Sequence, residues 1–227
     1  MKRVLPFLLL SAVCFAAPVQ AAFVRGKISF ISKRGQSPAV AETLVWLEPV
    51  AAKNIPRRPP AKFQLVTRNK TVIPHVLAVP VGSTVDFPNE DPISHNLFSL
   101  SNPNNFDVGL YRKGAGKSRT FTEPGIVNVY CNVHSNMSAV IHVLSTPYYA
   151  FADAAGNYSL GDIPAGRYRL VAWNEQGGRA ESTLDVAGNG AIAGDSSLTL
   201  DSRNVRIAPH TNKEGKAYAP LSTVKDY

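Results

Sequence analysis

The segment YCNVHSNM, residues 130–137, places three potential metal ligands at intervals of three residues: Cys131, His134 and Met137. A thiolate and a thioether are soft ligands that suit Cu(I), while imidazole suits several transition metals, copper among them. A cysteine without a partner in a secreted chain also permits an intermolecular bridge, a reactive thiol or an inert buried thiol. The segment therefore points to metal binding or thiol chemistry, and the elements around it narrow the choice.

Two expected strands position these side chains. The stretch 125–131 (GIVNVYC) predicts a strand that ends at Cys131, and 138–144 (SAVIHVL) predicts a second strand that begins after Met137. His134 then stands on the short loop between them. Because side chains alternate along a strand, two sets share a face: Val127 and Val129 with Cys131, and Ala139, Ile141 and Val143 with Met137.

A further ligand comes from another part of the chain. His95 follows an expected strand, STVDF at 83–87, and a stretch rich in Pro, Asn and Asp. One thiolate, two imidazoles and a weak axial thioether form the ligand set of a blue-copper site. A structural zinc site favours four strong ligands, and a c-type haem needs a C-x-x-C-H motif that this sequence lacks. A purple two-copper centre needs a second cysteine, and multicopper oxidases need His-x-His pairs.

The two ligand-bearing segments, GSTVDFPNEDPISHN and YCNVHSNMSAVIHV, resemble those of the cupredoxins, the family of plastocyanin, azurin and amicyanin. The Cys–His–Met spacing is similar to the short version in amicyanin. This resemblance implies a Greek-key β-sandwich with one type 1 copper ion held by His95, Cys131, His134 and Met137. It further implies that Asn96 sends its backbone N–H to the cysteine sulfur, and that Val133 and His134 lie at the contact with a redox partner.

The other three histidines lack such a context. His75 lies on or before an expected strand, His142 has the opposite parity to Met137, and His210 belongs to a polar tail. We expect each to be a surface or partly buried residue and not a metal ligand.

The rest of the chain predicts a second β-sandwich. Short Val-, Ile-, Tyr- and Leu-rich runs recur between turn residues, so the fold class is all-β. The stretch 153–173 predicts a hairpin and resembles part of the carboxypeptidase-regulatory-like, transthyretin-like sandwich. Residues 23–50 resemble the opening half of that sandwich. The simpler alternative is that 23–62 extends the cupredoxin. The expected division is a signal peptide (1–21), half a small sandwich with a linker (22–61), a cupredoxin domain (62–146), the second half (147–208) and a polar tail (209–227).

The N-terminus predicts export. Lys2 and Arg3 precede an apolar run, and small residues near Ala21 suit cleavage there. A lipoprotein modified at Cys14 is the weaker alternative. Beyond residue 21 no apolar run reaches the roughly 20 residues of a membrane helix. We therefore expect a periplasmic protein without a membrane span.

Charge and composition limit the possible functions. Loss of Lys2 and Arg3 leaves 22 basic and 16 acidic residues, a net charge of +6, which favours an acidic partner. Arg57 and Arg58 form the densest basic cluster, in an expected linker, and no motif for nucleic acid is present.

Two classes of function compete. The first is an electron carrier, not an enzyme, that serves a cytochrome or dehydrogenase; some bacterial proteins of similar pattern carry a methylamine-utilisation label. The second is a copper store or chaperone, or a surface- or carbohydrate-binding module. A thiol enzyme using Cys131 and His134 lacks a recognisable orienting group. The aromatic residues available to a carbohydrate platform are Trp46, Tyr148, Tyr149 and Trp173.

Overall fold

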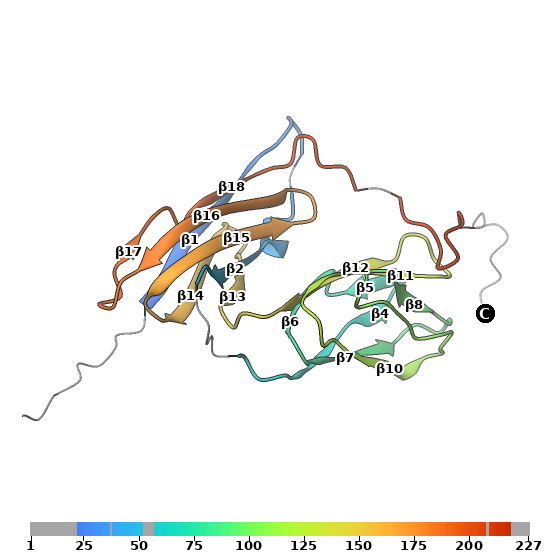
Figure 1. Ribbon diagram of the computed structural model, residues 1–227. Coiled ribbons are helices and arrows are strands. Elements are labelled where there is room, and N and C mark those ends of the chain that lie inside the picture. The colour runs from blue at the N-terminus through green and yellow to red at the C-terminus, as the bar shows by residue number, and fades with distance from the viewer. Residues whose placement is uncertain (1–21, 37, 52–56, 208, 219–227) are drawn as a thin grey trace, which may run out of the picture.

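The computed structural model describes residues 22–36, 38–51, 57–207 and 209–218 (Figure 1). Within these ranges the chain is all-β, apart from the short 3-10 helix η1 (Val40–Glu42), which confirms the predicted fold class. The expected signal peptide lies outside the described residues. No helix in the described ranges is long and apolar enough to cross a membrane.

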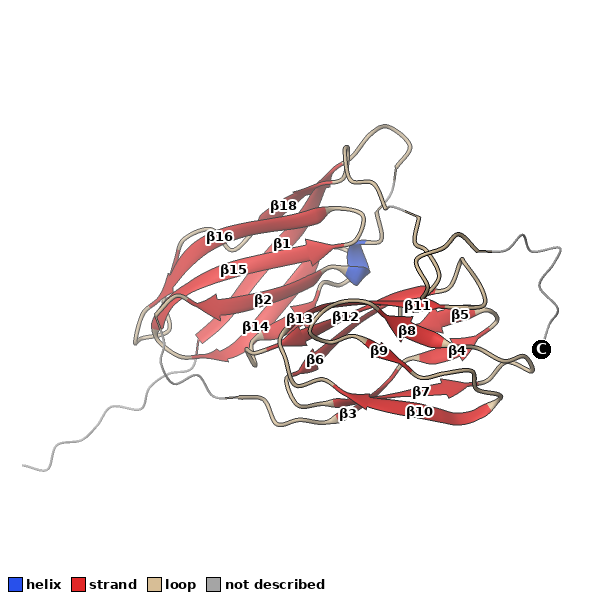
Figure 2. Cartoon of the chain, turned by 45° about the vertical axis from the view of Figure 1, so that its right-hand side comes forward, coloured by secondary structure: helices blue, strands red, loops and turns tan. Residues whose placement is uncertain are grey.

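The strands between residues 62 and 144 form two facing sheets, which we call the central sandwich (Figure 2). One sheet has the order β10-β7-β4-β5, with β3 also paired to β7, and the other has the order β6-β12-β11-β8-β9. The strands are β3 (Lys62–Gln64), β4 (Val66–Arg68), β5 (Thr71–Ile73), β6 (Val76–Pro80), β7 (Thr84–Asn89), β8 (Leu97–Ser99), β9 (Phe106–Asp107), β10 (Gly114–Thr120), β11 (Gly125–Cys131) and β12 (Ser138–Leu144).

The terminal sandwich combines strands from both ends of the chain. Its sheets have the orders β14-β1-β18 and β13-β2-β15-β16-β17, so strands before residue 50 pair with strands after residue 148. The two sandwiches lie side by side (Figure 1). The strands are β1 (Ala22–Ile31), β2 (Leu44–Pro49), β13 (Tyr149–Phe151), β14 (Asn157–Ile163), β15 (Gly166–Asn174), β16 (Gly178–Val186), β17 (Ile192–Ala193) and β18 (Leu198–Asp201).

The hairpin predicted for 153–173 is wrong. β14 pairs with β1, whereas β15 pairs with β2 and β16 in the other sheet. The short link at Pro164 therefore crosses between sheets. The physical reason is that alternate residues of both strands, including Leu160 and Leu170, are apolar and fill the same core from opposite sides. The alternation was visible in the sequence, but it does not distinguish a hairpin from a crossing between facing sheets.

Alternation along the strands builds the central core as predicted. Val127, Val129 and Cys131 of β11 are each fully buried, in one apolar cluster with Met137 and the residues of its parity on β12. β12 is nevertheless buried along both faces. Its second face lies against the terminal sandwich, where Leu144 joins a third apolar cluster with Trp46 and other residues of β2 and β15.

His142 occupies this junction between the sandwiches, more deeply than expected from the sequence. Its ring meets Trp173 edge-on at 4.3 Å between centroids, and its Nε2 atom is buried without a hydrogen-bond partner. Burial, assisted by the charge of Arg179, lowers the pKa of His142 to about 4. Nearby, the half-buried His75 reaches across to Glu175 of the terminal sandwich, at 2.5 Å from Nε2 to Oε2. Apolar packing and this polar contact hold the junction together.

Candidate metal centre

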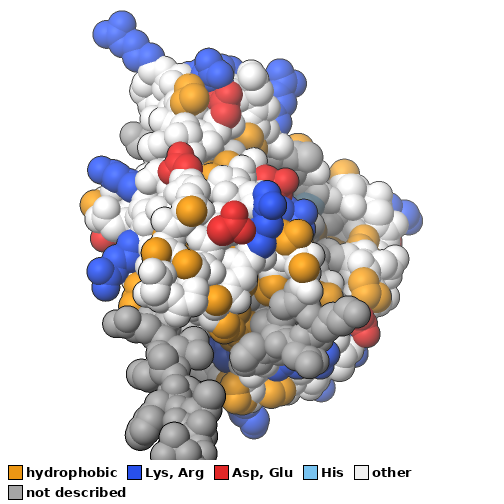
Figure 3. Space-filling view, turned by 60° about the vertical axis from the view of Figure 1, so that its left-hand side comes forward, with side chains coloured by type: hydrophobic (Ala, Val, Ile, Leu, Met, Phe, Trp, Pro, Cys, Tyr) orange, Lys and Arg blue, Asp and Glu red, His pale blue; other side chains and the backbone are white. Residues whose placement is uncertain are grey.

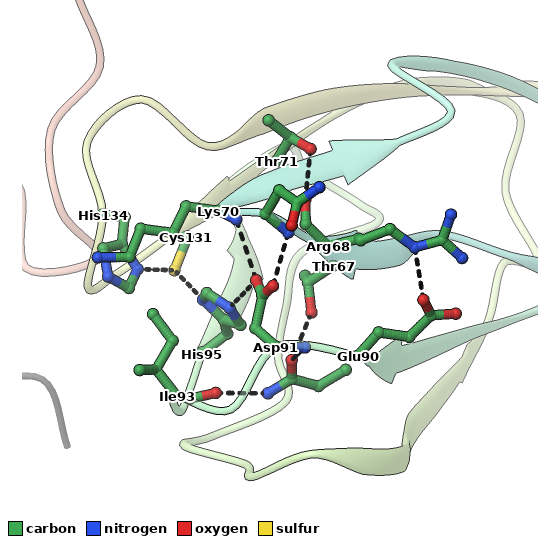
Figure 4. Close-up of polar contacts among 12 residues, drawn as sticks. Thr67, Arg68, Lys70, Thr71, Glu90, Asp91, Ile93, His95, Cys131 and His134 are labelled. Carbon is green, nitrogen blue, oxygen red and sulfur yellow. Dashed lines mark hydrogen bonds and ion pairs between the residues drawn. The ribbon is translucent and has the colours of Figure 1, made fainter.

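Three predicted ligands meet at one end of the central sandwich. His95 lies on the β7–β8 connection, Cys131 ends β11, and His134 lies on the β11–β12 loop. β11 pairs with both β8 and β12, so these three segments start from adjacent strands. The two histidine nitrogens and the sulfur lie within 4.8 Å of one another (Figure 4). The side chains are almost wholly enclosed, with exposures of 0%, 0% and 4%.

The spacing of these atoms fits a single metal ion. Nδ1 of His95 and Nδ1 of His134 each lie 3.8 Å from the Cys131 sulfur. Nitrogen and sulfur ligands at typical bond lengths of about 2.0–2.1 and 2.3 Å, set about 120° apart on one ion, are separated by about 3.8 Å. Two imidazoles and a thiolate in trigonal arrangement are the equatorial ligands of blue-copper sites. The donor atoms and their spacing therefore fit copper.

Met137 and Asn96 both lie close to this cluster along the backbone. Met137 is fully buried in the same apolar cluster as Cys131, and its carbonyl accepts the Cys131 N–H at 3.0 Å. Asn96 is buried, and its carbonyl accepts the N–H of Asn132 at 2.8 Å. The loop ends are thus tied together. The roles of the Met137 thioether as axial ligand and of the Asn96 N–H as donor to sulfur stay predictions.

Asp91, in the turn-rich stretch before His95, contacts that histidine directly. Its carboxylate accepts a hydrogen bond from His95 Nε2 at 2.8 Å (Figure 4). This bond places the ring proton on Nε2 and leaves the Nδ1 lone pair directed at the Cys131 sulfur. Carboxylates orient metal-binding histidines in this way in many sites. Its position four residues before His95, in a turn-rich stretch, was the available signal.

The tight turn between β4 and β5 holds the Asp91 carboxylate in place. The backbone N–H groups of Asn69 and Lys70 donate to its two carboxylate oxygens at 2.6 and 3.0 Å. Both residues have φ of 54°, as the tight β4–β5 turn requires. Burial alone would raise the pKa of Asp91, but the bonds from Lys70, His95 and Asn69 outweigh it and lower the pKa below its ordinary value. The carboxylate is therefore ionised and rigidly held.

The residues expected to meet a partner differ in their exposure. His134 is buried and Val133 is half-buried, so the imidazole edge is less open than the cupredoxin resemblance implied. Arg57 and Arg58 are exposed, and the Arg58 guanidinium also lies 4.8 Å from the centre of the Tyr149 ring. Figure 3 shows Lys and Arg side chains at separate places over one face of the molecule, with Asp and Glu among them.

The aromatic residues considered for a carbohydrate platform do not form one. Trp46 and Tyr148 are buried, at 5% and 7% exposure, and Tyr149 and Trp173 are half-buried against the junction. Trp46 donates its indole N–H to Glu48 within the terminal sandwich. These side chains serve packing between and within the sandwiches.

Comparisons with known proteins give structural neighbours only. No protein-family model matches this sequence, and no curated protein matches it. Similar solved structures include a purple cupredoxin from Nitrosopumilus maritimus, at 24% identity and a TM-score of 0.32, over 36% of this chain and 99% of that one. A variant of amicyanin in the Cu(I) state has 22% identity and a TM-score of 0.35, over 37% and 82%. A copper-containing nitrite reductase from Thermus scotoductus SA-01 has 26% and 0.35, over 52% and 28%.

Proposed function

We propose that this protein is a type 1 copper protein that carries single electrons between redox partners outside the cytoplasm. The observation that carries the proposal is the pair of imidazole Nδ1 atoms, each 3.8 Å from one fully buried cysteine sulfur. Among the described residues, no second group of three or more His, Cys, Asp or Glu side chains is arranged to hold a metal. We propose one copper ion per chain, held by His95, Cys131, His134 and Met137; the proximity of the first three residues supports this set.

The chain contributes rigidity and exclusion of water. A bound copper ion supplies a one-electron couple between Cu(I) and Cu(II). Asp91 fixes the His95 ring. The backbone hydrogen bond from Cys131 to Met137 holds the two ends of the ligand loop together, and the apolar cluster around Cys131 keeps solvent away. Ligands that are held in one geometry by the sheets need to move little between oxidation states, so transfer in either direction is fast.

The terminal sandwich is proposed to be a carboxypeptidase-regulatory-like domain that the cupredoxin domain interrupts. The pairing of β1 with β14, and of β2 with β13 and β15, supports this division because it joins residues 22–49 to the strands after 148. The packed junction around His142 supports a role for the terminal sandwich as a rigid spacer that holds the copper domain in a defined orientation. Export to the periplasm through a cleaved signal peptide completes this part of the proposal.

The proposed partner is an acidic redox protein, either a cytochrome or a dehydrogenase. The net charge of +6 expected after signal cleavage supports this choice. Val133, half-buried beside His134, lies at the proposed contact, while Arg57 and Arg58 steer the approach from the linker. We infer no catalytic reaction at the site, and the protein is not an enzyme.

Cyclic voltammetry of the copper-loaded protein separates the electron carrier from a copper store or chaperone. A carrier gives a reversible one-electron wave and keeps its copper in the presence of a competing chelator in both oxidation states. Ready loss of copper on reduction, without a reversible wave, supports storage or delivery and rejects electron transfer.

A further inference from the structure

The chain returns to the metal centre after completing the terminal sandwich. The last strand of the terminal sandwich, β18, ends at Asp201, and the C-terminal strap, residues 209–218, lies at the ligand-bearing end of the central sandwich (Figures 1 and 2). His210, Lys213 and Tyr218 are half-buried and contact this end, whereas residues 214–217 are exposed. One side of the strap is therefore packed and the other is open to solvent.

A tight turn shapes the middle of the strap. The Asn212 side chain accepts the N–H of Lys216 at 2.8 Å, and the Asn212 N–H donates to the Lys216 carbonyl at 2.9 Å. Gly215 has φ of +74°, a conformation that glycine adopts at little cost. The turn projects Lys213 toward the central sandwich and leaves Lys216 exposed.

Lys213 binds two residues next to the proposed ligands. Its backbone N–H donates to the side chain of Asn132 at 3.0 Å, and its ammonium group lies 2.8 Å from a carboxylate oxygen of Asp107. Asp107 in turn accepts the side-chain amide of Asn96 at 2.5 Å. The strap is thereby connected to the residue after Cys131 and to the residue after His95.

Tyr218 reaches a proposed ligand directly. Its hydroxyl donates to the carbonyl of Cys131 at 2.8 Å, the shortest of its contacts. Nδ1 of His210 lies 3.1 Å from the Tyr218 hydroxyl oxygen, and the His210 ring stacks on Tyr130 at 4.0 Å between centroids. Three consecutive residues, 130–132, therefore each carry one contact from the strap.

We propose that the strap is a structural part of the metal centre, in which Tyr218 and Lys213 are positioning residues that hold the ligand segments together and close the buried thiol from solvent. The inference rests on the proposed copper site. A segment attached to the other sandwich thus completes the enclosure that β8, β11 and the ligand loop begin. Opening of the strap is the first step by which a reagent or a copper acceptor reaches Cys131.

The test uses the chain from residue 22 on, in which Cys131 is the single cysteine. The metal-free protein is treated with N-ethylmaleimide under native conditions, and the rate of Cys131 alkylation is measured for Tyr218→Phe and Lys213→Ala. Loss of a hydrogen bond worth about 1 kcal/mol raises the open population about fivefold. We therefore expect alkylation about fivefold faster in Tyr218→Phe, and a smaller increase in Lys213→Ala, which removes a partly exposed ion pair with Asp107 but keeps the backbone N–H that binds Asn132. Lys216→Ala, an exposed lysine of the same turn, is the matched control and stays at the wild-type rate.

A second measurement follows positioning after copper loading. Tyr218→Phe keeps the ring but removes the donor to the Cys131 carbonyl, so the thiolate-to-copper absorption band is expected to shift, while Lys216→Ala leaves it unchanged. Alkylation rates equal to wild type in both strap variants overturn the proposal. If alkylation shows that the strap shields the thiol but the copper-loaded protein forms no such band, the proposed copper function is rejected and the shielding by the strap still holds.

Discussion

Asp91→Asn tests whether the Asp91 carboxylate orients the His95 ring. Asp91 accepts N–H groups from Asn69, Lys70 and His95 at 2.6, 3.0 and 2.8 Å, whereas asparagine offers one acceptor oxygen. If that oxygen faces Lys70 and His95, the amide opposes the Asn69 N–H, and a buried donor without an acceptor costs about 1–3 kcal/mol. If the amide faces His95 instead, it favours a proton on Nδ1, the atom needed for metal binding.

Both arrangements predict weaker copper binding. Loss of a carboxylate that orients a metal-binding histidine typically lowers the metal affinity about 10–100-fold, equal to about 1.4–2.7 kcal/mol. Competition with a copper chelator measures the affinity, and urea unfolding of the metal-free protein measures the stability. Glu90→Gln is the control, because the neighbouring Glu90 binds Arg68 on the exposed surface. An Asp91→Asn affinity within twofold of both wild type and Glu90→Gln refutes the orienting role.

Three further predictions concern the axial ligand, the junction and the partner surface. Met137→Leu, a change of similar volume in a fully buried position, is expected to retain copper and raise the reduction potential, and unchanged potentiometry argues against an axial thioether. His142 has a folded-state pKa of about 4, below the unfolded value of about 6.5, so the unfolded chain binds more protons and stability falls as the pH falls between these values. His142→Phe is expected to remove about 2 kcal/mol of this acid sensitivity between pH 7 and pH 4.5 in urea unfolding, and identical pH profiles contradict the burial of a neutral imidazole. Val133→Glu is expected to keep the absorption spectrum but slow stopped-flow electron transfer to the natural partner, whereas Arg57→Gln changes mainly the salt dependence of the association rate; an unaffected rate in Val133→Glu places the contact elsewhere.

Local patterns in the sequence were sufficient for β11, β12 and the proximity of Cys131 and His134, whereas His95 was assigned through the resemblance to cupredoxins. Alternation placed Val127, Val129 and Cys131 on one buried face, and the turn-rich stretch after STVDF marked the end of β7. The three-residue spacing of Cys131 and His134 also fixed their proximity, since Cys131 ends β11 and His134 lies on the short loop that follows. These features depend on neighbours within a few residues of one another.

Contacts between distant segments could not be predicted in the same way. Asp91 bonds to a turn 21–22 residues earlier, and Lys213 bonds to Asp107, 106 residues earlier. Neither pairing leaves a periodic signal. The predicted hairpin failed for a related reason, because alternation in β14 and β15 shows which side chains are buried but not which strands pair. Burial of both faces of β12 likewise required knowledge of the second sandwich.

The visible absorption spectrum of the copper-loaded protein, compared with that of Cys131→Ser, tests the central claim most directly. A thiolate bound to Cu(II) beside two imidazoles gives an intense charge-transfer band and a blue colour. We predict this band in the wild-type protein and its complete loss in Cys131→Ser, because a serine hydroxyl cannot replace the soft thiolate. A wild-type protein that binds copper without the band, or a blue Cys131→Ser variant, would contradict the assignment of the site.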